Sequence, residues 1–320
     1  MKRRKFLEDS LAGGALLGAG AFSPPPAQAQ QDDQHSDVVV ERDQAGQPHK
    51  GKVLAAIQPH CDDVPIFAGG TVLKLIAEGY RGILIRTSND EAAGRGDTVG
   101  QVVLNNERDN LAVARLMGLE KNFDLGYRNH LMDGISRLEM RARLIFLFRL
   151  MQVDTVICYD PWGPYEENPD HYVTASCVEA ACWMAGSRLD YPEHFEAGLT
   201  PHSVQEKYYF ARGPQLVNRV VDVSPYIDKK AEVNRANVTQ GPAGESGSQL
   251  RRRLAAEGKR LPILGDDDET ANNNYIIEFV FDRDREWGNR YGVEYAEPFH
   301  YIGAPADKLA DYIERNAVPR

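Results

Sequence analysis

Short continuous apolar runs alternate with segments of helical spacing along this chain, and that alternation is what most constrains its fold. Residues 53–57 are apolar at every position, which is typical of a strand buried on both faces. Residues 66–77 space their apolar side chains as a helix does, and Gly79 provides a usual helix end. The same reasoning predicts strands at 82–87, 123–125 and 153–159 and helices at 105–117, 135–151 and 170–185. Such alternation indicates an α/β protein with a mostly parallel sheet and helices on both faces.

The chain after residue 191 is harder to interpret. Strands are predicted at 208–210, 217–223 and 275–281, and a helix at 225–238. Residues 241–274 are rich in Gly, Ser and Asn, and we predict a loop insertion there. The acidic triplet at 266–268 has the composition of a calcium site, although a solvated turn is the favoured interpretation. We expect one domain over residues 51–310, with additional C-terminal strands.

The first 29 residues have the pattern of a secretory signal. Basic residues at 2–5 precede an apolar run at 11–22, and Ala27-Gln28-Ala29 supplies a small-residue cleavage site. Arg3 and Arg4 give this segment a resemblance to a twin-arginine export signal, whose machinery carries folded proteins. The apolar run is too short and too rich in Gly for a stable membrane span, and an uncleaved amphipathic anchor is the alternative. We expect a linker at 30–50 and a bacterial protein exported to the periplasm or beyond the cell.

The net charge limits the kinds of binding partner that we expect, and the positions of the cysteines indicate whether disulfides form. The formal net charge of −10 argues against a nucleic-acid binder, which needs a basic face to neutralise phosphates. The cysteines at 158, 177 and 182 lie in apolar strand or helix patterns, so we expect buried free thiols instead of a disulfide framework. A chain that folds in the reducing cytoplasm before export tolerates such thiols.

Polar side chains follow three of the predicted strands. His60 and two aspartates come after the first strand, residues 88–91 after the second, and residues 160–171 after the strand at 153–159. The carboxyl ends of parallel strands share one edge of a sheet, and α/β proteins bind ligands at that edge. We therefore expect these polar groups to meet there.

Two imidazoles and one carboxylate make His60, Asp63 and His171 candidate metal ligands. This donor set suits zinc better than calcium or magnesium, although another divalent metal remains an alternative. Three protein ligands leave a position for water, and zinc lowers the pKa of bound water to roughly 7. Asp62 is placed to accept that proton as a general base. The competing interpretation is that the aspartates, including Asp170, only cap the helices that follow them.

Two short motifs carry a resemblance to a known family. The first reads Pro59-His60-Cys61-Asp62-Asp63. The second reads Asn168-Pro169-Asp170-His171. They are similar to the Pro-His-Pro-Asp-Asp and His-Pro-Asp-His motifs of the PIG-L (LmbE-like) N-acetylglucosaminyl deacetylases, and the resemblance extends in order and spacing over residues 52–185. It implies a Rossmann-like three-layer fold and a zinc-dependent amidohydrolase that removes acetyl groups from N-acetylglucosamine-type sugars or cleaves related amides.

The resemblance also implies roles for individual residues. His60, Asp63 and His171 match the family's zinc ligands. Asp62 matches its general base. Asp170 matches an acidic residue that supports the site by orienting a ligand or water.

Two positions depart from the family pattern. Cys61 replaces a proline, and Asn168 replaces the first histidine of the second motif. Asparagine donates a hydrogen bond to a developing oxyanion but cannot donate a proton at neutral pH. Activity is therefore expected to be reduced if the proton of that histidine is essential. Tyr165 and Glu166 are the candidate substitutes.

Contacts to the substrate are predicted from loop position. Polar side chains near the expected cleft suit sugar hydroxyls, but they equally suit an ordinary surface loop. Trp162 either stacks on a sugar ring or simply packs. The candidate substrate-binding residues are Asn89, Asp90, Arg95, Arg108, Asn129, Asp133 and Tyr165.

Two other classes of function compete with an exported deacetylase. A sugar-binding relative of the same fold, weakened by Asn168, would bind its ligand without cleaving it. A nucleotide-binding Rossmann protein is disfavoured because no G-x-G-x-x-G sequence follows the first predicted strand. The expected partner is a small-molecule or glycan substrate, and the sequence leaves open the acyl group, the sugar and the oligomeric state.

Overall fold

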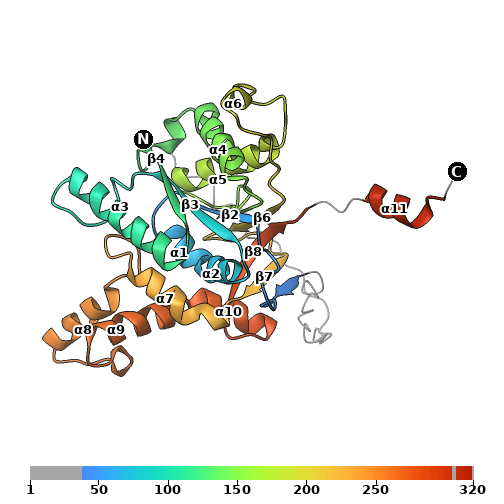
Figure 1. The fold of residues 1–320 in the computed structure, drawn as a ribbon. Helices are drawn as coiled ribbons and strands as arrows, with labels where there is room; N and C mark the ends of the chain where they lie inside the picture. The colour runs from blue at the N-terminus through green and yellow to red at the C-terminus, as the bar shows by residue number, and fades with distance from the viewer. Residues whose placement is uncertain (1–37, 305–307, 319–320) are drawn as a thin grey trace, which may run out of the picture. The chain divides into compact units, whose positions relative to one another are not determined.

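The computed structural model describes residues 38–304 and 308–318, and its strands form one mixed sheet (Figure 1). The strands are β1 (Val39–Glu41), β2 (Val53–Gln58), β3 (Arg81–Ser88), β4 (Lys121–Tyr127), β5 (Thr155–Tyr159), β6 (Glu206–Phe210), β7 (Arg219–Asp222) and β8 (Ala296–Ile302). Their order across the sheet is β1-β7-β8-β6-β5-β2-β3-β4. Neighbours pair in parallel except for β8, which runs antiparallel to β6 and β7. The predicted α/β fold with additional C-terminal strands is thus confirmed.

Strands β2 and β5 lie together near the middle of the sheet. Every residue of β2 is buried, and Ala55 aligns with Ile83 of β3 on one side and Val156 of β5 on the other. A strand enclosed in this way is apolar throughout, which explains the run at 53–57. The chain order reverses at this pair, because β2 leads outward to β3 and β4 whereas β5 leads to β6. Ligands bind in α/β proteins at such reversals.

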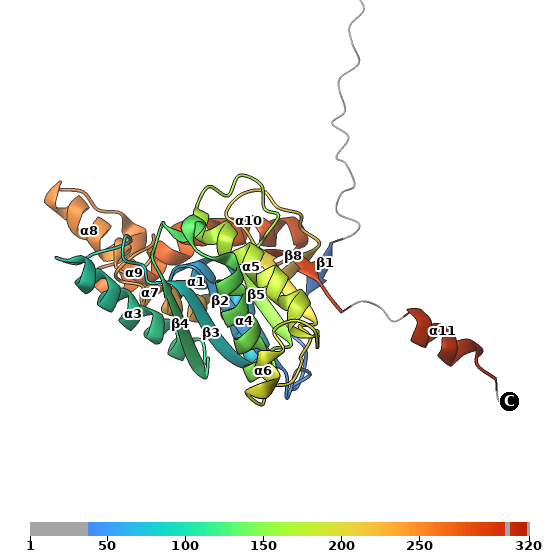
Figure 2. The ribbon, with the colours of Figure 1, turned by 90° about the horizontal axis from the view of Figure 1, so that it is seen from above.

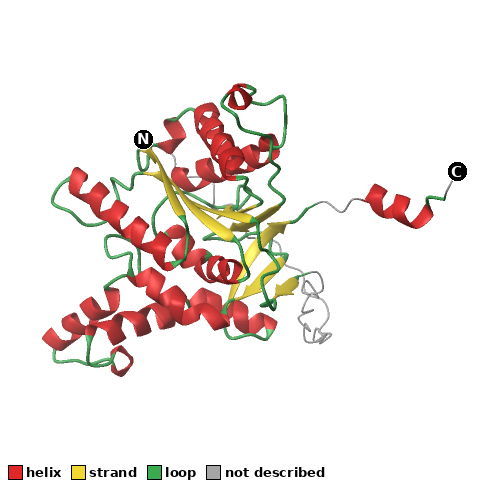
Figure 3. Cartoon of the chain, viewed as in Figure 1, coloured by secondary structure: helices red, strands yellow, loops and turns green. Residues whose placement is uncertain are grey.

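Helices cover both faces of the sheet (Figures 1 and 3). One face carries α1 (Asp63–Phe67), α2 (Gly69–Ala77), α3 (Val99–Leu116) and α7 (Ile227–Arg235). The other carries α4 (Arg137–Met151) and α5 (Pro169–Ala185), which lie side by side in Figure 2. The side chains of Thr98, Ser136 and Asn168 cap the first turns of α3, α4 and α5, which fixes where these helices begin.

The remaining elements are helical. They are α6 (Glu193–Glu196), α8 (Ser246–Ala256), α9 (Asp268–Tyr275), α10 (Asp282–Tyr291), α11 (Lys308–Asn316) and the short turns η1 (Met132–Gly134), η2 (Ser224–Tyr226), η3 (Pro262–Leu264) and η4 (Ile276–Val280), the last of which is a π-helical turn.

The structure differs from the sequence prediction in two apolar segments. Part of the predicted linker forms β1, which pairs with β7 and places Glu41 against Lys74 and Arg219. Residues 275–281 were predicted as a strand, but residues 275–280 are helical through the end of α9 and η4. A short apolar run does not by itself distinguish a buried strand from a buried helix.

The predicted loop insertion at 241–274 is also wrong, because most of it folds into α8, η3 and α9. The acidic triplet contributes to that folding. Asp267 caps α9 by accepting from the backbone N–H of Thr270, and Asp268 pairs with Arg251 and Arg252. These pairings favour a structural role for the triplet over calcium binding.

Residues 1–29, the predicted signal, and the first part of the predicted linker lie outside the described residues. Within 38–304 and 308–318, none of the helices has both the length and the hydropathy required to span a membrane. The four cysteines are buried as free thiols.

Candidate metal centre

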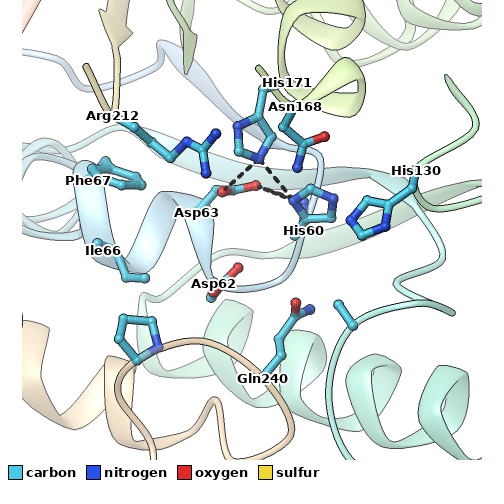
Figure 4. A pocket seen from close by; sticks show the side chains of 12 residues that line it. His60, Asp62, Asp63, Ile66, Phe67, His130, Asn168, His171, Arg212 and Gln240 are labelled. Atoms are coloured by element: carbon cyan, nitrogen blue, oxygen red, sulfur yellow. Dashed lines mark hydrogen bonds and ion pairs between the residues drawn. The ribbon is translucent and has the colours of Figure 1, made fainter. Parts of the chain in front are cut away.

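The two motifs meet where β2 and β5 end, as their positions in the sequence predict. The segment after β2 carries His60 and leads into α1, whose first residue is Asp63. The loop after β5 leads to Asn168, which caps α5, and His171 lies in the first turn of that helix. Figure 4 shows the side chains of His60, Asp63 and His171 pointing toward one another.

The three side chains present their donor atoms at short range. His60 Nδ1 lies 3.1 Å from His171 Nε2 and 3.3 Å from Asp63 Oδ2, and Asp63 Oδ1 lies 3.5 Å from His171 Nε2. All three residues are buried. Ligand atoms roughly 2.0 Å from a tetrahedral zinc ion are about 3.3 Å from one another. The donor set and its spacing therefore fit one zinc-sized cation.

Other polar groups hold the far sides of these ligands. His60 Nε2 faces Asp170 Oδ2 at 3.0 Å and Asn129 Nδ2 at 2.9 Å. The Tyr159 hydroxyl donates to Asp63 Oδ1 at 2.8 Å, and the backbone N–H of His60 donates to Asp63 Oδ2. A ligand whose outer atoms are bonded keeps its orientation and its tautomer.

The charges of the cluster favour a cation. Burial lowers the pKa of His60, but the Asp63 and Asp170 carboxylates outweigh burial and raise that pKa well above its usual value. Burial raises the pKa of Asp63, yet the charges of His171 and His60 lower it to about 2. The buried carboxylates therefore stabilise a positive charge placed between them. Either a proton on His60 or a bound metal ion supplies that charge.

A pocket of about 350 Å³ opens beside the cluster. Asp62 lines it, and burial together with the Asp63 carboxylate raises the pKa of Asp62 to about 7. A cation among the neighbouring ligands opposes this shift and favours the charged base. The lining residues are His60, Asp62, Asp63, Ile66, Phe67, Ala93, His130, Asn168, His171, Arg212, Gln240 and Pro242.

Comparison with known proteins identifies the part of the chain that carries both motifs. Residues 55–182 match the family described as PIG-L: GlcNAc-PI de-N-acetylase. These residues are similar to a PIG-L domain over 128 of the 320 positions of the chain. A diacetylchitobiose deacetylase from Thermococcus kodakarensis is 28% identical over 194 residues, which cover 60% of this chain and 71% of that protein.

Two solved structures share the fold. An N,N'-diacetylchitobiose deacetylase from Pyrococcus horikoshii has a TM-score of 0.63 at 23% identity, covering 81% of this chain and 88% of that chain. A 4-carboxy-2-hydroxymuconate hydratase from Pseudomonas putida has a TM-score of 0.56 at 15% identity, covering 80% of this chain and 98% of that chain. Proteins with two different activities share this architecture, so the reaction is argued from the site.

Asn168 of the second motif has a defined orientation. Its Oδ1 accepts the backbone N–H of Asp170 at 3.0 Å as the cap of α5. The side-chain amide group lines the pocket beside His171 (Figure 4). The capping bond uses the oxygen, which leaves the amide N–H donors for the pocket. Burial raises the pKa of Asp170, but its contact with His60 and the bonds from the backbone N–H of His130 and from Asn129 outweigh burial and lower that pKa.

Glu166 is not free to act as the substitute proton donor. It lies 3.1 Å from His171 Nδ1 and is paired with Arg212. Burial raises the pKa of Glu166, but these two partners outweigh burial and lower the pKa to about 2. Tyr165 is 89% exposed and does not line the described pocket.

The predicted substrate-binding residues divide into inner and outer groups. Asn129 is buried against His60 and Asp170, and Asp90 is buried against Arg86 and the backbone N–H of Cys61. Both therefore buttress the motif loops. The Asn89 side chain accepts the backbone N–H groups of Glu91 in its own loop and of Asn129. The side chains that are exposed and outside the pocket lining are Arg95, Arg108, Asp133 and Trp162. Their contacts with a substrate remain predictions.

Cys61 points away from the candidate ligands. Its thiol faces Asn106 and accepts from Gln240, and burial raises the pKa of that thiol well above its usual value. A neutral thiol so placed is a poor metal ligand, and Cys61 does not belong to the cluster of His60, Asp63 and His171.

Seven pocket residues were not predicted as site residues from the sequence, namely Ile66, Phe67, Ala93, His130, Arg212, Gln240 and Pro242. The position of Arg212 in the sequence could have identified it as a site residue. It follows β6, whose carboxyl end lies at the same edge of the sheet as the carboxyl ends of β2 and β5. Gln240 and Pro242 lie in a loop between helices, where single residues carry no recognisable pattern.

Proposed function

We propose that this protein is a metal-dependent hydrolase that removes an acyl group, acetyl in the first instance, from an N-acylated amino sugar or a related amide. The observation that carries the proposal is the buried cluster of His60, Asp63 and His171 with Asp62 beside it in one pocket. The similarity to a PIG-L domain and the likeness to a diacetylchitobiose deacetylase support the choice of an N-acetylated sugar. Zinc is the proposed metal because the donor set is two imidazoles and one carboxylate.

The residues of the pocket have complementary tasks in amide hydrolysis. A zinc ion held by the three ligands supplies Lewis acidity and acidifies water at neutral pH. Asp62 takes the proton of the attacking water, and the N–H group of Asn168 donates to the substrate oxygen as negative charge develops there. Asp62 then returns the proton to the amine that leaves. Water and amide are consumed, and a carboxylate and an amine are formed.

The first test combines metal analysis with an amine-release assay. We expect the purified protein to contain about one zinc per chain and to release amine from N,N'-diacetylchitobiose or N-acetylglucosamine. Asp62→Asn should keep the metal and lose the activity. A metal-loaded protein that hydrolyses no N-acyl sugar or related amide would contradict the proposal.

The alternative of a sugar-binding relative has one observation in its favour. Asn168 stands at the position of the family histidine and cannot supply a proton. Under this alternative the metal-loaded protein binds chitobiose derivatives in calorimetry but releases no amine. The same two measurements therefore separate the two functions.

Export is a further part of the proposal. It is supported by the basic, apolar and small-residue order of residues 1–29. The twin-arginine route is supported by Arg3 and Arg4 and by the free thiols, which suit folding before export. Cell fractionation tests it: replacing both arginines by lysine should retain the protein in the cytoplasm, and unchanged export would exclude this route.

A further inference from the structure

We propose that Glu166, held in place by Arg212, positions His171 and thereby strengthens metal binding at this site. The inference rests on the metal centre of the proposed function and assigns a positioning residue that neither motif predicts. It concerns two residues outside the candidate ligand set, one from the loop after β5 and one from the segment after β6.

Glu166 contacts three separate parts of the site. Its Oε1 lies 3.1 Å from His171 Nδ1 and accepts the backbone N–H of Asn168 at 3.0 Å. Arg212 donates from Nη2 to Oε1 at 2.5 Å and from Nε to Oε2 at 3.2 Å. The guanidinium therefore binds both carboxylate oxygens, which restricts rotation of the Glu166 side chain.

The contact is directed at the nitrogen that does not face the cluster. His171 Nε2 points at His60 and Asp63, so its lone pair is needed there and the ring proton belongs on Nδ1. A carboxylate beside Nδ1 stabilises that tautomer. The Glu166 contact has ion-pair distance without hydrogen-bond alignment, so it acts on His171 through its charge. Tyr159 stacks on the same ring at a centroid distance of 4.1 Å and limits its tilt.

Both imidazoles of the cluster are thus backed by a carboxylate, but in different ways. Asp170 behind His60 is fully buried and lies in the same motif as His171. Glu166 behind His171 depends on Arg212, whose side chain is 39% exposed and lines the pocket. Arg212 therefore links the pocket wall to a metal ligand through a single carboxylate.

The test measures zinc affinity by chelator competition on the full chain. Glu166→Gln keeps the size of the side chain and removes its charge, and we expect affinity to fall about 10- to 100-fold, the usual effect of losing a ligand's outer partner. Arg212→Met should weaken zinc binding in the same direction but less, and Arg212→Lys should restore part of the loss. Glu167→Gln is the matched control, because Glu167 is the adjacent carboxylate, is 88% exposed and lies 4.0 Å from Arg212.

A second readout separates positioning from direct catalysis. At saturating zinc, the kcat of Glu166→Gln should approach that of the unaltered protein. Unchanged zinc affinity in both Glu166→Gln and Arg212→Met would overturn the inference and leave the proposed metal site intact. A fall in kcat at saturating zinc with unchanged affinity would also overturn it. Failure of the unaltered protein to bind zinc would contradict the proposed function itself.

Discussion

The pocket has two walls of different construction. The inner wall is the cluster of His60, Asp63 and His171, in which each residue is no more than 6% exposed. The outer wall is formed by Arg212, by Gln240 and by Pro242, which are exposed or partly exposed. The inner wall comes from the edge of the parallel sheet, whereas the outer wall comes from segments that follow β6 and α7.

Because of this difference in construction, we expect the two walls to have different roles. Inner-wall atoms have polar partners on their far sides, so the fold itself fixes their positions and an ion requires little rearrangement. Outer-wall side chains are more exposed than the inner wall, so they are the ones that an incoming substrate reaches first. We infer that the inner wall sets the chemistry and that the outer wall adjusts the choice of substrate.

The largest effect should follow from removing an inner-wall ligand. His60→Ala is expected to lose the bound metal and to reduce amide hydrolysis about 10³-fold or more, because the group that stabilises the developing charge is lost. His130→Ala is the matched control. Its ring centroid lies 6.3 Å from that of His60, and it lines the pocket without belonging to the cluster. Equal metal content in the two variants, measured by elemental analysis, would show that His60 is not a metal ligand of the inner wall.

The next effect concerns the general base. Asp62→Asn should keep the metal and lower kcat about 10²- to 10⁴-fold, which is the usual contribution of general acid–base catalysis. The KM should change little, because Asp62 acts on water and not on the sugar. Steady-state kinetics on metal-loaded protein test this, and unchanged turnover would show that another group accepts the proton.

The contrast between the walls also explains what could be predicted from the sequence. Strands β2, β3 and β5 were predictable because strands buried on both faces are apolar through most of their length, and α3, α4 and α5 begin at capping residues. The inner wall was predictable because its residues directly follow those strands. Strand β8 is not a continuous apolar run, because it contains the buried Glu297. This carboxylate pairs with Lys230, which lies in a helix far away in the chain. A buried ion pair of this kind has no local signature.

Gln240 and Pro242 of the outer wall were not predictable for the same reason. Gln240 reaches the pocket only because the loop after α7 packs on the first motif, where its Nε2 donates to Cys61 Sγ and Asn106 Oδ1. That contact joins residues almost two hundred positions apart. Segments 241–274 and 275–281 were misassigned because their helices are stabilised by pairings made within the folded structure, such as Asp268 with Arg251.

A third, smaller effect is expected at Gly241, where the loop after α7 comes close to Asp62. Gly241 has a φ of +83°, and a Cβ at this position would lie 2.5 Å from Asp62 Oδ2. Gly241→Ala should displace either the loop or the base and lower kcat about tenfold, since small misplacements of a catalytic group are costly. Gly258→Ala controls for backbone strain, because Gly258 has a φ of +69° and no neighbour within 4 Å of its Cβ position. Equal kcat values for the two variants would mean that the loop does not position Asp62.

The smallest effect should come from the outer wall alone. Pro242 is exposed, lines the pocket and has no place in the metal cluster. Pro242→Ala should change KM by about twofold, the scale of an exposed substitution, and leave kcat and metal content unaltered. Pro262→Ala, an exposed proline at the start of η3 and outside the pocket lining, should leave KM unchanged. A large loss of kcat in Pro242→Ala with KM preserved would place this wall in the chemistry, because substrate selection acts on binding and the reacting groups act on turnover.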